Sequence, residues 1–270
     1  MIVPRIHTRL SLARDLDSLG IRAGDMVMVH AAMKRVGRLL NGPDVLIEAL
    51  RDAVGPAGTI VAYTDWNGDY DALLDENGRV PPEWRAHIAP FDPAVSRAAR
   101  DNGVLAEFIR TTSVARRSGN PGASVAAIGA RADWLTADHP LDYGYGETSP
   151  LGRLVAGGKV LMAGAPLDTM TLLHHAEHLA RIPNKRLRRY EAPFATSAGV
   201  VWRMLEEFDT SDPVVPGLDD DYFGGIVGAF LTSGQGAQGL VGDAGSVLVD
   251  AAAICSFAVA WLEHHVRLEG

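Results

Sequence analysis

The side chains best suited to proton transfer stand together in one short segment. Positions i, i+3 and i+4 of a helix are neighbours, so four of these residues would share one helical face: Thr171, His174, Glu177 and His178. His175 is rotated off that face. An imidazole beside a carboxylate is a common way to make a general base that works near neutral pH. The spacing therefore predicts a catalytic base on a short helix.

The same segment also fits a metal site. His174-x-x-Glu177-His178 matches the inverted zinc-peptidase signature, in which two histidines bind zinc and the glutamate activates a water. Such a site needs a third protein ligand, which Glu206 or Glu207 could supply. On this pattern alone, a zinc-dependent hydrolase stays open as an alternative.

Two basic turns could bind phosphate or carboxylate groups. Residues 30–37 read His-Ala-Ala-Met-Lys-Arg-Val-Gly, so small residues allow close backbone approach beside Lys34 and Arg35. This is not a Walker loop, because the G-x-x-x-x-G-K-[ST] pattern is missing. Arg116 and Arg117 precede a second turn, rich in Gly and Pro. A solvated basic turn is the alternative interpretation of residues 30–37.

Two loops are strongly acidic, at residues 65–76 and 206–221. Acidic runs are often only solvated surface, but aromatic residues within both loops favour a binding rim. The net charge of −8 makes nucleic acid a poor partner, since nucleic acid demands a basic face. A cationic small molecule is the better candidate.

The elements that must position these residues follow from hydrophobic periodicity. Short apolar runs bounded by Gly, Asp or Pro predict strands at residues 26–30, 59–63, 124–128, 160–163 and 199–204. Helical spacing predicts helices at residues 10–19, 43–54, 102–110 and 251–262. Asp168 or Thr169 could cap the helix that carries His174, with Pro183 beyond its end. Alternating strands and helices indicate a layered α/β fold.

Length and composition narrow the class further. The chain has 270 residues, 47% of them hydrophobic, which excludes a disordered protein. No apolar run approaches the roughly 18 residues that a membrane span requires, and the N-terminus lacks the apolar stretch of a secretory signal. A cytoplasmic location without membrane attachment is therefore expected. The single cysteine, Cys255, excludes an intrachain disulfide and a cysteine-based zinc site.

Several long motifs, in order, resemble the aminoglycoside 3-N-acetyltransferase family. They cover nearly the whole chain, at residues 19–37, 42–43, 53–59, 90–94, 146–151, 164–177, 182–186 and 251–263. The resemblance implies a single domain over residues 1–270, a layered α/β sandwich with a mixed central sheet. It implies transfer of an acetyl group from acetyl-CoA to the 3-amino group of a 2-deoxystreptamine aminoglycoside, which confers antibiotic resistance. No metal is expected. A non-catalytic binder of cationic small molecules remains the alternative from another class.

The resemblance also assigns residues. It implies His174 as the catalytic base, Glu177 as the carboxylate that orients it, and Thr171 in the neighbouring slot; Thr171 or loop N–H groups are candidate donors to the oxyanion. The expected CoA contacts are His30, Ala31, Ala32, Met33, Lys34, Arg35, Val36, Gly37, Ser118 and Ser149. Glu207 and Asp209 match acidic positions that receive the drug's ammonium groups. Charge adds three further candidates from the acidic loops, Asp69, Asp71 and Asp212.

One departure from the family pattern is plain. Family members usually carry a histidine where this chain has Asn120, and an acidic residue where it has Gly122. The segment 208–216 also drifts. These changes leave the His174 motif intact and bear on which aminoglycosides are accepted.

Overall fold

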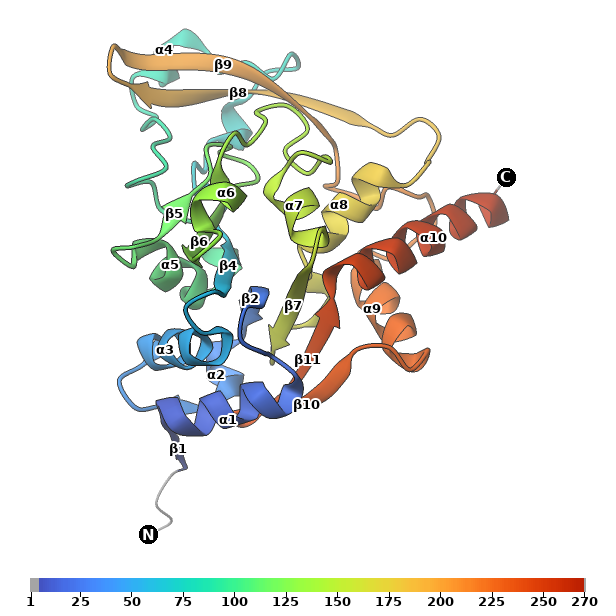
Figure 1. The fold of residues 1–270 in the computed structure, drawn as a ribbon. Coiled ribbons are helices and arrows are strands. Elements are labelled where there is room, and N and C mark those ends of the chain that lie inside the picture. Colours follow the sequence, from blue (N-terminus) through green and yellow to red (C-terminus); the bar gives the residue numbers. More distant parts are fainter. Residues whose placement is uncertain (1–4, 270) are drawn as a thin grey trace.

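A mixed sheet of seven strands forms the centre of the molecule (Figure 1). This computed structural model describes residues 5–269, with side chains as far as residue 266. The strands, in spatial order, are β10 (Ala237–Val241), β11 (Ala244–Asp250), β7 (Gly158–Ala163), β2 (Met26–Ala31), β4 (Thr59–Tyr63), β6 (Val125–Gly129) and β5 (Arg116–Arg117). The central strands β7, β2 and β4 are parallel, and the remaining pairings are antiparallel. The predicted α/β class with a mixed central sheet is confirmed.

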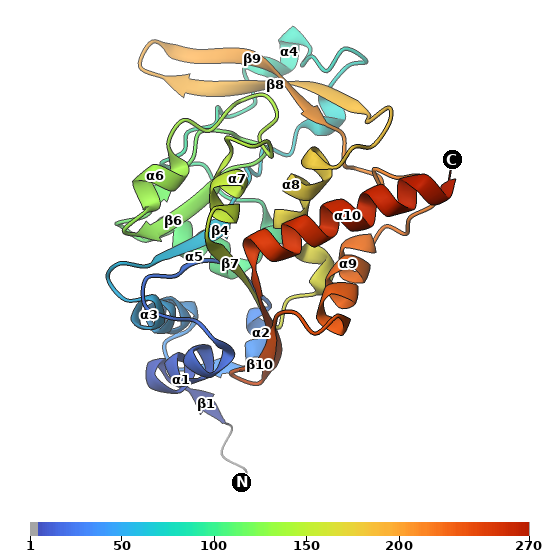
Figure 2. The ribbon, with the colours of Figure 1, turned by 45° about the vertical axis from the view of Figure 1, so that its right-hand side comes forward.

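Both faces of the sheet are covered, because its central strands are apolar on both sides. Met26 and Met28 of β2 point into one core, while Val27 and Val29 point into the other. The helices over the valine face are α1 (Arg9–Leu19), α3 (Pro43–Val54) and α5 (Val104–Thr111). Those over the methionine face are α6 (Ala132–Thr136), α7 (Pro150–Val155), α8 (Leu172–Leu179), α9 (Tyr222–Thr232) and α10 (Ala251–Glu269). Figure 2 shows α10 crossing α8, against which it packs.

A long hairpin lies beyond one end of the sheet, at the top of both views. Its strands are β8 (Leu187–Thr196) and β9 (Gly199–Phe208), which pair with each other over their whole length. Short elements complete the fold: β1 (Ile6–His7), α2 (Met33–Val36), β3 (Arg38–Leu39), η1 (Asp71–Leu73), α4 (Pro82–Arg85), η2 (Arg100–Asn102) and η3 (Leu167–Thr169). The base of the hairpin brings β9 toward α8.

The predicted start of the His174 helix is wrong. Neither Asp168 nor Thr169 caps α8, which begins at Leu172 with Thr171 at the N-cap position and no side-chain cap bond. Thr169 instead closes the preceding turn, because its hydroxyl donates to the carbonyl of Pro166. The helix ends at Leu179, ahead of Pro183.

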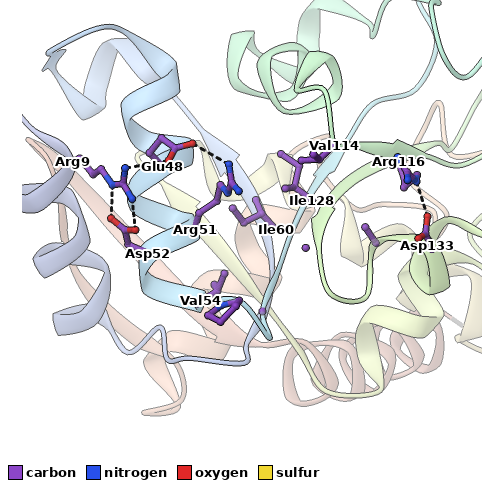
Figure 3. A pocket seen from close by; sticks show the side chains of 15 residues that line it. Arg9, Glu48, Arg51, Asp52, Val54, Ile60, Val114, Arg116, Ile128 and Asp133 are labelled. Atoms are coloured by element: carbon purple, nitrogen blue, oxygen red, sulfur yellow. Dashed lines mark hydrogen bonds and ion pairs between the residues drawn. The ribbon is translucent and has the colours of Figure 1, made fainter.

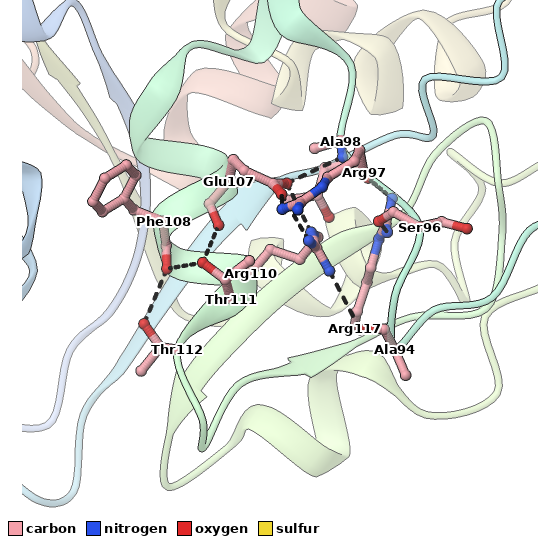
Figure 4. A network of polar contacts seen from close by, with 11 residues as sticks. Ala94, Ser96, Arg97, Ala98, Glu107, Phe108, Arg110, Thr111, Thr112 and Arg117 are labelled. Atoms are coloured by element: carbon pink, nitrogen blue, oxygen red, sulfur yellow. Dashed lines mark hydrogen bonds and ion pairs between the residues drawn. The ribbon is translucent and has the colours of Figure 1, made fainter.

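A network of charged side chains anchors the loops beside the sheet (Figure 4). The carboxylate of Glu107 accepts from the guanidinium groups of Arg97, at 2.6 Å, and Arg110, at 2.7 Å, and from the backbone of Ala98. Burial opposes ionisation, but these hydrogen bonds prevail and lower the pKa of Glu107 to about 2. The network therefore stays ionised and ties α5 to the segment around Arg97.

Arg117 extends this anchoring toward the sheet. Its guanidinium donates to the carbonyls of Ser96 and Thr64 and to the hydroxyl of Ser124, and lies 5.1 Å from the ring centre of Phe91. The N–H groups of its guanidinium are thus engaged in hydrogen bonds within the protein. This argues against the predicted role of Arg117 in binding a phosphate or carboxylate ligand.

Among the residues that the structure describes, no helix has the length and apolar character needed to cross a bilayer.

Candidate active site

His174 and Glu177 form a hydrogen-bonded pair on α8. The Nδ1 atom of His174 lies 2.7 Å from Oε2 of Glu177. The carboxylate is only 2% exposed, whereas the imidazole is 27% exposed. Because Glu177 engages Nδ1, the Nε2 atom is left to exchange a proton with a ligand.

Two aromatic rings hold the plane of the imidazole. Tyr145 stacks on His174 with ring centres 5.0 Å apart and an interplanar angle of 29°. Phe223 of α9 meets it edge to face, also at 5.0 Å. The histidine is therefore bound at one nitrogen and packed on two sides.

Two cavities meet at this histidine. One, of about 450 Å³, lies between the loop after β4, the loop at 120–123 and the end of the hairpin. The other, of about 360 Å³, lies at the ends of β2 and β4, against η3 and α9. Within the described part of the chain, His174 is the one residue that lines both. A group transferred from one cavity to the other would pass its imidazole.

The first cavity is acidic. Five carboxylates line it, from both acidic loops: Asp65, Asp69, Asp71, Glu207 and Asp209. Arg188 is the basic residue in this lining, and it pairs with Asp71 at 2.7 Å. The structure thus brings four of the five predicted substrate-binding carboxylates together at one cavity.

Burial raises the pKa of two of these carboxyls. Burial raises the pKa of Asp65 to about 6, although a hydrogen bond from the amide of Asn102 opposes the rise. Burial also raises the pKa of Glu207, against backbone N–H groups that include that of Phe208. A cationic ligand would favour the ionised form of both.

Asp212 does not join this group. Its carboxylate is 74% exposed and lies 3.6 Å from a guanidinium nitrogen of Arg186, outside the lining of the cavity. This position does not support the predicted role of Asp212 as a substrate ligand, because its carboxylate is mostly exposed and faces Arg186.

The second cavity contains only the first part of the predicted CoA segment. His30, Ala31 and Ala32 line it, together with Thr171. Burial lowers the pKa of His30 to about 4, so its imidazole is neutral at physiological pH, and its Nε2 atom is buried without a partner. These residues place a small, neutral wall beside His174.

The remaining residues of that segment, Met33 to Gly37, lie outside this lining. They form α2 and its end: the guanidinium of Arg35 donates to the carbonyl of Gly164, and Val36 is fully buried. At Gly37 the φ angle is +102°, a backbone conformation that residues with a Cβ atom rarely adopt, so this turn favours glycine. Val36 and Gly37 therefore shape the fold rather than line the cavity.

Ser118 and Ser149, two of the predicted CoA contacts, lie outside the lining of both cavities. Both are fully buried. The hydroxyl of Ser118 bonds to the backbone of Val125 and to His139. The hydroxyl of Ser149 accepts from the backbone of Gly152 as the N-cap of α7. Neither hydroxyl can reach a ligand in this arrangement, because each is enclosed by the bonds it makes.

Sequence reasoning missed several residues that line the site. Asp65 stands two residues beyond the carboxyl end of the parallel strand β4, and this end of a strand is a signal for a ligand site in α/β sheets. Tyr63 and Tyr145 line the two cavities on either side of His174 and bond to each other at 2.7 Å. No local pattern marks these tyrosines, since they meet from segments 82 residues apart.

The zinc alternative finds no third ligand. The Nδ1 atom of His174 is taken by Glu177, the very residue that would activate water in that mechanism. Residues 5–266 contain no group of three His, Cys, Asp or Glu side chains placed to hold a metal ion.

A larger cavity, of about 620 Å³, lies elsewhere, between α3, the β4–β6 edge and α6 (Figure 3). Its charged side chains are paired with one another: Arg9 with Asp52, Arg51 with Glu48, and Arg116 with Asp133. Arg116 therefore does not serve the predicted anion site. We do not assign the active site to this cavity, although it is the larger one. Its charged side chains are paired with one another, and no candidate base lines it.

Comparisons with known proteins agree on one family. The family model described as aminoglycoside 3-N-acetyltransferase matches residues 28–263. Aminoglycoside N(3)-acetyltransferase III of Pseudomonas aeruginosa is 46% identical over 259 residues, covering 95% of this chain and 94% of the relative. Aminoglycoside N(3)-acetyltransferase VIII of Streptomyces fradiae is 43% identical over 271 residues, covering 95% of this chain and 92% of the relative.

Solved structures show the same likeness. A binary complex of AAC-IIIb with CoASH has a TM-score of 0.95 and 68% sequence identity, with coverage of 96% of this chain and 97% of that one. A sisomicin-bound AAC-VIa has a TM-score of 0.90 and 39% identity, with coverage of 96% of this chain and 99% of that one.

Proposed function

This chain belongs to the aminoglycoside 3-N-acetyltransferase family, and we propose that His174 is the general base of the reaction. The enzyme transfers an acetyl group from acetyl-CoA to the 3-amino group of a 2-deoxystreptamine aminoglycoside, a reaction that confers antibiotic resistance. The observation that carries the proposal is the place of His174, which lines both cavities and is bonded at Nδ1 to a buried carboxylate.

The two cavities differ in chemistry, and this suggests which substrate each one holds. Aminoglycosides carry several ammonium groups, so the cavity with five carboxylates suits the drug. The cavity lined by His30, Ala31 and Ala32 suits the thioester end of acetyl-CoA, because its small side chains permit close approach. We place the phosphates of CoA near Lys34 and Arg35, which follow directly along the chain.

The 3-amino group is an ammonium at neutral pH, and it must first lose one proton to solvent to become a nucleophile. In the proposed mechanism the neutral amine nitrogen then attacks the thioester carbon, and Nε2 of His174 accepts the second proton, which the nitrogen releases as the C–N bond forms. Glu177 holds the imidazole in the tautomer that leaves Nε2 free and stabilises the imidazolium that forms. The C–S bond then breaks, and the proton returns from His174 to the thiolate of CoA.

Negative charge develops on the thioester oxygen during the attack. Thr171 lies one turn before His174 and lines the second cavity, which supports its hydroxyl as a donor to that oxygen; loop N–H groups are the other candidate donors. The nearby His30 imidazole is neutral near physiological pH, because burial lowers its pKa to about 4.

Release of the CoA thiol, followed with a thiol reagent against a panel of aminoglycosides, tests the proposal. We expect release only with drugs that carry a free 3-amino group, and NMR of the product should place the acetyl group there. His174→Ala should remove this activity. Binding of drug without thiol release would support the non-catalytic alternative, and loss of activity with a chelator would revive the hydrolase. The cytoplasmic location stays a prediction.

A further inference from the structure

His174 needs more than its bond to Glu177 to keep its orientation. A single hydrogen bond at Nδ1 fixes one atom of the ring but leaves the ring free to tilt about that bond. The stacked ring of Tyr145 removes this freedom on one side, at 5.0 Å and 29°. We propose that Asn120, Tyr63 and Tyr145 form a positioning device that aims Nε2 of His174 at the boundary between the two cavities. This inference rests on the role of His174 as the base.

The hydroxyl of Tyr145 is tied down by two groups. It lies 2.7 Å from the hydroxyl of Tyr63 and 3.3 Å from the carbonyl of Gly122. Tyr63 itself lies 2.8 Å from the same carbonyl. Each phenol has one hydrogen, so the shorter distances give one arrangement: Tyr63 donates to Gly122, and Tyr145 donates to Tyr63. No phenolic hydrogen is left for the substrate.

Neither phenol takes part in proton transfer. Burial raises the pKa of both Tyr63 and Tyr145 well above the ordinary value for tyrosine, so both stay neutral near physiological pH. Both hydroxyl hydrogens are engaged in hydrogen bonds and both phenols are neutral. The two tyrosines therefore act on His174 only by holding its position.

Asn120 fixes the carbonyl that anchors the phenols. Its Oδ1 accepts from the backbone of Gly122, at 2.9 Å, and of Ala123, at 3.1 Å. Its Nδ2 donates to the carbonyls of Pro140, at 2.7 Å, and Leu141, at 3.1 Å. The side chain is nearly fully buried, and both of its donors and both acceptor positions are used. It therefore ties the loop with Gly122 to the segment that leads into Tyr145.

Close packing leaves little room for the device to relax. A Cβ atom at Gly122 would lie 2.5 Å from the hydroxyl of Tyr190. One at Gly144 would lie 2.5 Å from the amide nitrogen of Asn120. The segment that leads into Tyr145 thus approaches Asn120 as closely as glycine allows, and Gly122 packs equally closely against Tyr190 of β8. In this proposal Asn120 holds the loop in place. Its departure from the family pattern had suggested a different role, in determining which aminoglycosides are accepted.

Steady-state kinetics of matched variants test the device. Tyr63→Phe and Tyr145→Phe keep the rings and remove one hydroxyl each, so each should lower kcat about tenfold, the share of one neutral hydrogen bond. Tyr145→Leu removes the ring and should lower kcat about 10²-fold, as a misplaced catalytic group does. KM for drug and acetyl-CoA should stay within about threefold. Tyr143→Phe is the control, because its hydroxyl bonds to Glu206 and its ring packs on His178 and Phe208 instead.

Two combinations make the test specific. The double variant Tyr63→Phe/Tyr145→Phe should lose no more than the worse single variant, because both hydroxyls serve one tether. Tyr145→Leu should cost nothing further in a His174→Ala background, measured by slow product accumulation at high enzyme concentration. An additive loss in either combination would overturn the inference, as would a rise in the drug KM of Tyr145→Phe with kcat unchanged.

Asn120→Asp probes the clamp, because it keeps an oxygen acceptor and loses the two N–H donors. We expect kcat to fall for all aminoglycosides alike, with their ranking by kcat/KM unchanged. A changed ranking at constant kcat would mean that Asn120 reads the drug, against the proposal. Activity retained by His174→Ala would instead remove the base itself, so the two failures are distinguishable.

Discussion

His174 and Glu177 lie one turn apart on α8, with 2.7 Å between Nδ1 and Oε2, yet their surroundings are opposite. The carboxylate is sealed inside the protein, while the imidazole reaches both cavities. Water cannot compete for the buried carboxylate, so the tautomer of the imidazole is held by the fold. This division places the proton acceptor where the two substrates must meet.

Removing the base is the first prediction. His174→Ala should lower kcat by about 10²–10⁴-fold, the usual share of general base catalysis. Glu177→Gln should be milder but severe, since the imidazole remains while its orientation and charge stabilisation weaken. Thiol release and calorimetric binding of CoA measure both. His87→Ala is the matched control, because His87 is exposed and follows the end of α4, outside the lining of both cavities. Activity of His174→Ala within a few-fold of the wild type would rule out this base.

The cations after β2 give the second prediction. Lys34→Glu combined with Arg35→Glu should raise the KM for acetyl-CoA at least tenfold, because a charge-assisted hydrogen bond contributes about 1.5–3 kcal/mol. The drug KM should be unchanged. Acetyl-pantetheine, which lacks the nucleotide phosphates, is the control substrate, and its KM should not respond. A rise in the drug KM alone would mean that the two sites are exchanged.

The acidic cavity gives the third prediction. Glu207→Gln combined with Asp209→Asn should raise the drug KM at least tenfold and spare the KM of acetyl-CoA. Surface attraction is screened beyond about 8 Å at physiological salt, so the wild-type drug kcat/KM should fall as salt rises, and the double variant should show a weaker salt dependence. Asp212→Asn is the comparison, since that carboxylate lies outside the cavity and should matter little. If the double variant bound the drug at low salt as tightly as the wild type does, these carboxylates would be solvated surface groups and not ligands of the drug.

Drug binding should also depend on pH through Asp65, the fourth prediction. Its carboxyl is neutral well below pH 6 and ionised above, because burial raises its pKa to about 6. An ammonium group prefers the ionised form, so the drug Kd should fall as pH rises from 5 to 7. Asp65→Asn keeps an acceptor for Asn102. In this variant the decrease in the drug Kd between pH 5 and pH 7 should be about tenfold smaller than in the wild type, which corresponds to about 1.4 kcal/mol. Calorimetric titration without acetyl-CoA measures it. If the drug Kd changed with pH in the same way in the wild type and in Asp65→Asn, Asp65 would be excluded as the titrating group.

The last prediction concerns the cap of α7. Ser149→Ala should cost about 1 kcal/mol, as loss of an N-cap does, and lower Tm by about 2–4 °C. The KM for acetyl-CoA should not change, because Ser149 is buried. Thr8→Ala, which removes the cap of α1 on the other face of the sheet, should behave alike. A raised KM with an unchanged Tm would restore Ser149 as a CoA ligand.

The amino-acid sequence alone determined the elements whose pattern is local. The helix predicted at 43–54 and the strand predicted at 59–63 match α3 and β4 to the residue, because apolar periodicity and flanking Gly and Pro are read within one segment. The contact between His174 and Glu177 was equally readable, since residues three apart meet on any helix. In contrast, β8 escaped prediction: its charged residues and Pro193 hide the alternation of a strand whose partner is β9.

Only the tertiary structure decided how the site is assembled. It placed His174 between two cavities, brought Tyr63 to Tyr145, and buried Ser149 and Ser118 that the sequence assigned to CoA. None of this has a local signal, because the partners come from distant segments whose meeting depends on how the sheet orders its strands. Burial decides the rest, since a hydroxyl or carboxyl of one type can cap a helix, hold a loop or face a ligand according to what covers it.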